Sequence, residues 1–113
     1  MMSNRIPRAN ALIKKELSKI LLREVDFPSG VLVTVTRVET LPNLSEAKIY
    51  ISVIPESKTE EVFRILNKEI YNLQQQLNKR LKMRPVPKIW LKKEEKAKEA
   101  ARIEEVLEQL KKS

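Results

Sequence analysis

The sequence predicts a single α+β domain over residues 1–113, with helices on one face of a small sheet. Apolar residues recur at the helical period near the start and in the middle of the chain, and they alternate in the segments between. With 113 residues, of which 42% are hydrophobic, the chain can build one core but not two ordinary domains. The predicted order is helix, strand, strand, helix (one or two), strand, helix.

The first predicted helix covers residues 3–24. Its apolar residues lie at spacings of four, four, three and one, which places them on one helical face: Ala9, Ile13, Leu17, Ile20 and Leu21. A second face is basic and carries Arg8, Lys15, Lys19 and Arg23. A solvated helix surface and a phosphate-binding surface explain this basic stripe equally well.

Two strands follow the first helix. Pro28 ends the helix, and Gly30, the only glycine, supplies the conformational freedom that a turn needs. Residues 31–39 are mostly β-branched, and residues 47–54 alternate between apolar and polar side chains. We expect an antiparallel pair with one face covered by helices.

A long helix is predicted after the second strand. Ser57 stands three residues ahead of Glu60, which is the spacing of a capping box, and Thr59 is the alternative N-cap. The helical period continues through residues 62–81 without a glycine or proline, so it predicts one helix of more than about twenty residues. The sequence gives no signal for or against a bend near Tyr71.

The last third of the chain begins with a proline-rich break. Pro85 and Pro87 end the long helix, and residues 86–93 are predicted to form a short third strand at a sheet edge, where a missing N–H group is tolerated. Apolar residues at helical spacing then predict an amphipathic helix over residues 94–113, as a C-terminal extension of the domain.

Composition argues against catalysis. The chain has no histidine and no cysteine, so the commonest general base, the commonest zinc ligands and the thiol nucleophile are missing. A single glycine excludes the glycine-rich loops that hold nucleotide phosphates. The glutamates after residue 93 alternate with cations at helical spacing, as on a solvated helix. We therefore expect a protein that is not an enzyme and that has no cofactor and no metal.

Charge indicates the kind of partner. The 23 Lys and Arg residues exceed the 15 Asp and Glu residues, which gives a net charge of +8 and favours a polyanionic partner such as nucleic acid or an anionic membrane. The N-terminal segment has no apolar run long enough for a signal peptide or a membrane span. We expect a monomer in the cytoplasm that does not bind a membrane.

The densest basic stretch is residues 77–93, which contain no acidic residue. Four of its cations are predicted in the last turns of the long helix: Lys79, Arg80, Lys82 and Arg84. The helix dipole accounts for one or two cations there, and the excess indicates phosphate binding. Lys88 follows in the third strand. Trp90 can stack on a base, but partial burial against a helix is the favoured interpretation.

Four stretches together resemble the ribosome-binding factor A family. They are "RIPRANALIKKELSKILLREV", "VTVTRVETLPNLSEAKIYISV", "LNKRLKMRPVPKIWL" and "ARIEEVLEQL", in the family's order over nearly the whole chain. The resemblance implies a KH-like fold of the type II order, which is helix, strand, strand, helix, helix, strand. It also implies binding to the small ribosomal subunit and its ribosomal RNA during late maturation and rRNA processing, often linked with growth in the cold.

The sequence departs from the expected pattern in the middle helices. The family usually has a small-x-Gly kink between its second and third helices, and Glu69, Ile70 and Tyr71 stand at that place. KH domains generally clamp RNA with a Gly-x-x-Gly loop, and the chain has no such loop. The resemblance implies the same absence, because the family also lacks this loop. A permanent structural protein of a ribonucleoprotein is the alternative function. The candidate RNA-binding residues are Arg5, Arg8, Lys15, Lys19, Arg23, Lys79, Arg80, Lys82, Arg84 and Lys88.

Overall fold

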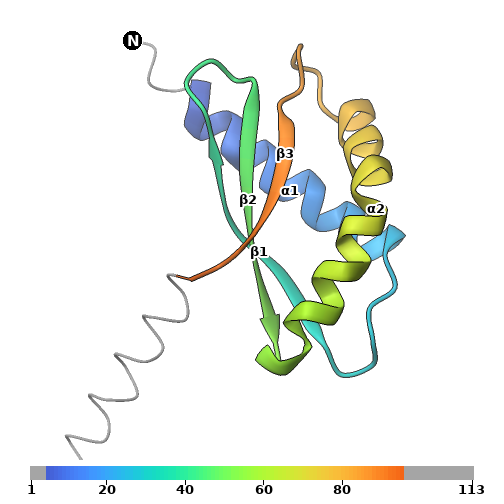
Figure 1. Cartoon of the computed structure of the whole chain (residues 1–113). Helices are drawn as coiled ribbons and strands as arrows, with labels where there is room; N and C mark the ends of the chain where they lie inside the picture. Colours follow the sequence, from blue (N-terminus) through green and yellow to red (C-terminus); the bar gives the residue numbers. More distant parts are fainter. Residues whose placement is uncertain (1–4, 96–113) are drawn as a thin grey trace, which may run out of the picture.

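The computed structural model describes residues 5–95 and confirms the α+β class (Figure 1). The elements are α1 (Arg5–Glu24), β1 (Leu32–Thr40), β2 (Glu46–Ile54), the 3-10 turn η2 (Glu56–Lys58), α2 (Thr59–Arg80) and β3 (Lys88–Lys93). The helix predicted from residue 94 onward lies outside the described residues, except that Glu94 and Glu95 are not helical.

The three strands form one sheet in the order β1, β2, β3. β1 and β2 are antiparallel, as predicted, and β3 lies parallel to β2 at the sheet edge. The register between β1 and β2 shifts between Val35 and Arg37, so Thr36 is an extra residue in β1. In the parallel pair, Lys48 lies opposite Trp90.

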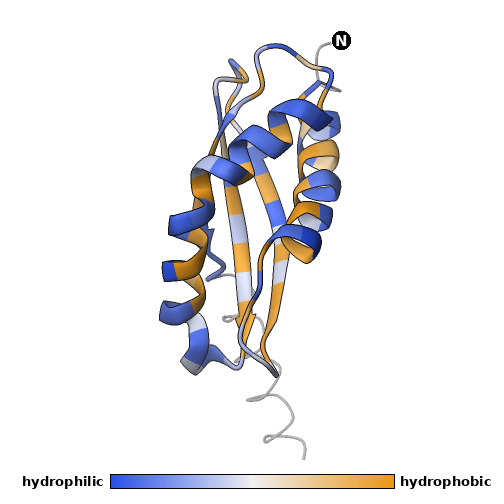
Figure 2. Cartoon of the chain, turned by 90° about the vertical axis from the view of Figure 1, so that its right-hand side faces the viewer, coloured by the Kyte–Doolittle hydropathy of each residue, from blue (hydrophilic) through white to orange (hydrophobic). Residues whose placement is uncertain are grey.

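Both helices pack on the same face of the sheet. Along β2, burial alternates strictly, with Ala47, Ile49, Ile51 and Val53 buried and Lys48, Tyr50 and Ser52 on the opposite face. The buried side chains meet the apolar stripe of α1, in which Ile13, Leu17 and Ile20 are fully buried. Hydrophilic residues occupy the outer sides of the helices (Figure 2). The opposite face of the sheet, called the open face below, carries no helix among residues 5–95.

One continuous helix stands where the family order has two. α2 runs unbroken from Thr59 to Arg80, as its apolar period predicts. It nevertheless changes direction near its middle (Figures 1 and 2), which divides it into two arms. Leu66 in the first arm and Leu73 and Leu77 in the second are fully buried. The bend contains no glycine or proline, and both arms pack on the core, so we expect packing and not a flexible joint to hold it.

The ends of α2 differ from the prediction. Its N-cap is Lys58, without a side-chain cap, so neither Ser57 nor Thr59 caps the helix. Thr59 is the first helical residue, and its hydroxyl donates to the carbonyl of Glu56 at 2.7 Å. The helix ends at Arg80, because Leu81 is already extended. Lys82 and Arg84 therefore lie in the loop before β3 and not in the last helical turns.

Gln74 on α2 holds the free edge of β3. Its side-chain oxygen accepts from the N–H of Ile89 at 2.9 Å, and its amide nitrogen donates to the carbonyl of Pro87 at 3.1 Å. These backbone groups face away from β2 and would otherwise lack partners in the sheet. The contact fixes β3 against the second arm of α2.

Candidate nucleic-acid interface

The basic stripe of α1 is exposed, as predicted. Arg8, Lys15, Lys19 and Arg23 all lie on the surface, because the apolar residues between them turn toward the core. Lys19 lies 3.9 Å from Glu16, and the other three form no ion pair within residues 5–95. Lys14, which the sequence reasoning missed, is exposed beside Lys15.

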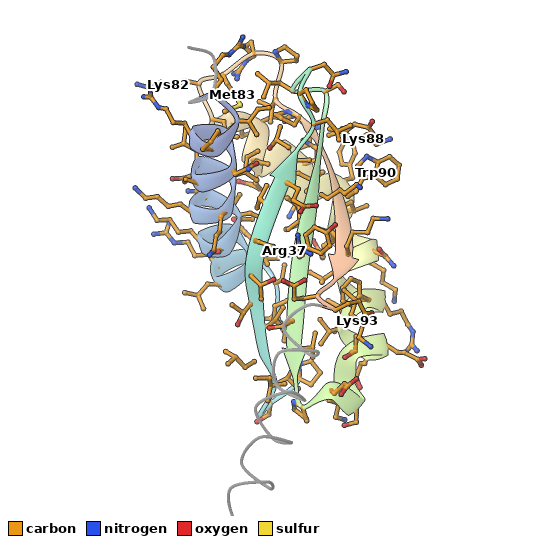
Figure 3. All side chains as sticks on the ribbon, turned by 90° about the vertical axis from the view of Figure 1, so that its left-hand side faces the viewer. Arg37, Lys82, Met83, Lys88, Trp90 and Lys93 are labelled. Carbon is orange, nitrogen blue, oxygen red and sulfur yellow. The ribbon has the colours of Figure 1, made fainter. Side chains whose placement is uncertain are left out.

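The loop between α2 and β3 meets the first turns of α1. Arg5, Arg8, Ala9 and Leu12 line a shallow pocket of about 270 Å³ together with Leu44 and Met83. Lys82 is exposed beside Met83, and Figure 3 shows both at this end of the molecule. The fold thus joins two separate basic stretches into one helix-side surface, made of Arg5, Arg8, Lys15, Lys19, Arg23 and Lys82.

Arg80 is the last residue of α2, as predicted, but it is not exposed as a phosphate-binding cation would be. Its side chain is 27% exposed, and its Nη1 atom lies 3.8 Å from Oε1 of Glu16 on α1. Its Nε atom is buried without a hydrogen-bond partner among the described residues. Because Arg80 follows Leu77 by three positions, it lies on the helix side that packs against α1.

The two cations on either side of Arg80 have different surroundings. Lys79 is exposed in the last turn of α2. The guanidinium of Arg84 folds back, and its Nη1 atom donates to the carbonyls of Leu81 and Met83 at 2.7 Å each. Arg84 therefore satisfies carbonyl groups just after the helix, even though the residue is exposed.

Lys88 and Trp90 lie on the open face of the sheet, away from the helix-side surface (Figure 3). Trp90 is 44% exposed and lies on the face that carries no helix among residues 5–95, so the interpretation that it is partly buried against a helix is wrong. Alternation along β3 explains its position, because Ile89 on the other face is buried. Lys48 and Lys92 are exposed on the same face and were missed, although strand alternation alone would have found them.

Arg37, at the centre of the open face in Figure 3, is engaged by acidic and aromatic neighbours. Its Nε atom donates to Glu94 at 2.9 Å, its Nη1 atom pairs with Glu39, and its guanidinium lies 3.6 Å from the ring centre of Tyr50. The hydrogen bond to Glu94, followed by the charges of Glu94 and Glu39, raises the pKa of Arg37. The side chain of Glu94 is only 4% exposed. Arg37 thus stabilises the sheet through these contacts, and its guanidinium is not available to bind phosphate.

The described residues show neither a metal centre nor a membrane segment. No group of three or more His, Cys, Asp and Glu side chains within residues 5–95 is placed to hold a metal ion. No helix in that range combines the length and the apolar character needed to cross a bilayer.

Comparison with known proteins gives one family. The family model described as Ribosome-binding factor A matches residues 5–107. Ribosome-binding factor A of Halothermothrix orenii is 33% identical over 112 residues, covering 98% of this chain and 92% of the relative. The solution structure of a putative ribosome binding factor A from Thermotoga maritima is 28% identical, with a TM-score of 0.64, covering 80% of this chain and 87% of that one.

A further solved structure shares the fold. It is a homology model of Thermus thermophilus ribosome binding factor A, fitted into a cryo-EM map of that protein's complex with the 30S subunit. It is 24% identical to this chain, with a TM-score of 0.64, and the match covers 74% of this chain and 88% of the other.

Proposed function

The chain belongs to the ribosome-binding factor A family, and from this premise we propose that it is an assembly factor that binds the small ribosomal subunit and its ribosomal RNA during late maturation. The family match extends over residues 5–107, and the relatives it joins are named for ribosome binding. The Thermus thermophilus member is described in a complex with the 30S subunit.

The helix-side surface is the observation that carries this proposal. Cations from α1 and from the loop between α2 and β3 meet there, and Arg8, Lys15 and Arg23 form no ion pair within residues 5–95. Cations without acidic neighbours are free to replace the counterions of phosphate groups, and the released counterions drive binding. Folding brings these cations onto one surface while the apolar residues between them form the core. This arrangement explains why the chain is strongly basic and still has a conventional core.

The shape of the surface fits a phosphate backbone. From Arg8 to Arg23 the stripe spans 15 residues, or roughly 22 Å at about 1.5 Å per residue. Side chains at helical spacing along such a length can reach several phosphates in a row. Because the chain has no Gly-x-x-Gly loop, RNA is held by side-chain cations and not by a backbone clamp.

The protein acts by binding and not by catalysis. With no histidine and no cysteine in the whole sequence, the chain lacks the side chains most often used for proton transfer, and the described residues offer no metal-binding cluster. The cytoplasm, where ribosomal subunits mature, is the proposed location, and the monomer is the proposed form.

Sedimentation tests the proposal against its alternative. In a gradient of cell extract, an assembly factor is expected to migrate with free small subunits and to be absent from full, translating ribosomes, because it leaves when maturation ends. A permanent structural protein would stay with full ribosomes. Finding the protein in translating ribosomes at the same stoichiometry as in free subunits would contradict the proposed function.

A further inference from the structure

The open face of the sheet carries a cluster that the helix-side surface does not use. It consists of Trp90, Lys48, Lys88 and Lys92, from the adjacent strands β2 and β3. We propose that this cluster, called the open-face site below, binds an unpaired RNA base stacked on the indole of Trp90, with the neighbouring phosphates held by the lysines. This goes beyond the proposed function, and rests on it only in taking RNA as the ligand.

The indole ring is held in place before any ligand arrives. Its Nε1–H group donates to Oε1 of Glu46 at 2.6 Å, and Nζ of Lys88 lies 4.6 Å from the ring centre. Strand pairing sets Glu46 opposite Lys88 and Lys48 opposite Trp90. A ring fixed by pairing and by a hydrogen bond loses little conformational freedom when a base stacks on it, which favours affinity.

A hollow adjoins the ring. Trp90 lines a pocket of about 150 Å³ together with Leu41, Glu46, Lys48 and Lys92. Lys88, which lies over the ring, is not among the lining residues of this pocket. An aromatic wall flanked by lysines is the combination that binds bases of single strands without sequence preference.

The lysines of the open face are not neutralised by acidic neighbours. Lys48, Lys88 and Lys92 form no ion pair within residues 5–95. The acidic side chains of this face have other partners, since Glu46 accepts from Trp90 while Glu39 and Glu94 pair with Arg37. The balance favours an anion, and the exposed indole favours an anion that carries rings. Single-stranded RNA has both, whereas a duplex keeps its bases stacked inside.

Trp90 is itself the probe, because it is the only tryptophan in the chain. Titration of the full chain with a short single-stranded RNA is expected to quench its fluorescence. A duplex of the same length, and an abasic oligomer with the same phosphates, are expected to quench much less. Equal quenching by the abasic oligomer would mean that charge alone acts, and would overturn the stacking proposal. The proposal would also be overturned if single-stranded RNA did not quench the fluorescence of Trp90. It would be overturned as well if acrylamide, a small soluble quencher, could not reach the ring in the free protein.

Variants separate stacking from charge. Using labelled single-stranded RNA, Trp90→Leu is expected to bind roughly 5- to 150-fold more weakly, the range for loss of one stacked base. Lys48→Gln with Lys92→Gln is expected to reduce the salt dependence and to keep the quenching at low salt. Lys68→Gln, at an exposed lysine of α2, is the control and should bind as the wild type does. Melting of each variant verifies folding, and a folded Trp90→Leu protein with wild-type affinity would refute the site.

The two proposals fail separately. If the open-face site is wrong and the proposed function right, the quenching is lost while the protein still migrates with small subunits. If the proposed function is wrong, migration with small subunits is lost whatever the oligonucleotides show.

Discussion

The carboxylate of Glu16 on α1 lies 3.8 Å from the guanidinium of Arg80 on α2 and 3.9 Å from the ammonium of Lys19. This contact joins the two helices at the side of the core. It also separates Arg80 from the other cations of the basic stretch, since Arg80 is half-buried while Lys79 and Lys82 are exposed. The stretch therefore contains cations with different roles.

Arg80→Ala is expected to lower the free energy of unfolding by about 1 kcal/mol, because it removes a partly buried ion pair and the packing of the side-chain stem. Lys79→Ala, one position away and exposed, is the matched control and should change stability by less than about 0.5 kcal/mol. Urea denaturation measures both. Equal stability of the two variants would show that the Glu16 contact contributes nothing.

Gln74→Leu is expected to cost about 1 to 3 kcal/mol, since it leaves the N–H of Ile89 and the carbonyl of Pro87 without their side-chain partner. Gln75→Leu is the control, because Gln75 forms no such bond to β3 among the described residues. Thermal melting compares the two. Amide exchange at Ile89 should be faster in Gln74→Leu, and unchanged protection there would count against this role.

Glu94→Gln is expected to lower the free energy of unfolding, because Arg37 then bonds to an uncharged acceptor in place of a carboxylate whose side chain is only 4% exposed. Glu95→Gln removes the same charge from the exposed neighbouring residue and should change stability by less than about 0.5 kcal/mol. Chemical denaturation is again the measurement. If both variants matched the wild type, Glu94 would be only a surface charge.

The pKa of Tyr50 is raised above its ordinary value by burial and by the hydrogen bond to Glu39. When pH rises through about 10, the phenol deprotonates in the unfolded chain before it does so in the folded one, so the unfolded state binds fewer protons and stability falls. Tyr50→Phe should weaken this alkaline loss. Unfolding midpoints between neutral and alkaline pH verify it, and an identical pH dependence for both proteins would contradict the assignment.

The sequence predicts the fold well because buried residues recur along it at the periods of a helix and of a strand. Ile13 and Leu17 on α1, and Ile49 and Ile51 on β2, are buried with the periods of a helix and a strand. The same alternation places Trp90 opposite Ile89, so its exposure was available from the sequence. The prediction that Trp90 is partly buried against a helix is wrong because alternation with the buried Ile89 places its side chain on the face without a helix.

Other parts of the site depend on contacts between distant residues. Glu94 and Arg37 are 57 positions apart, and no local pattern connects them. Arg80 belonged to a run of cations, although its spacing after Leu73 and Leu77 marks the packed side of α2. Met83 lines one pocket with Arg5 and Arg8, and this arrangement can be seen only in the folded chain. The local spacing of apolar residues predicts the helices and strands and their buried faces. The surfaces formed by residues from several elements depend on how those elements pack, which local spacing does not give.

The central claim is that the helix-side surface binds ribosomal phosphate, and small-subunit binding across a salt series tests it most directly. The variant Arg8→Gln, Lys15→Gln, Lys82→Gln removes three exposed cations of this surface. The control Lys58→Gln, Arg64→Gln, Lys68→Gln removes the same charge from η2 and the first arm of α2.

If each lost contact lowers the slope of log affinity against log salt by roughly 0.7 to 0.9, the first variant loses about 2 to 3 in slope. The control is expected to keep nearly the wild-type slope. A folded first variant whose affinity and slope equal those of the control would contradict the account, since net charge alone would then explain the binding.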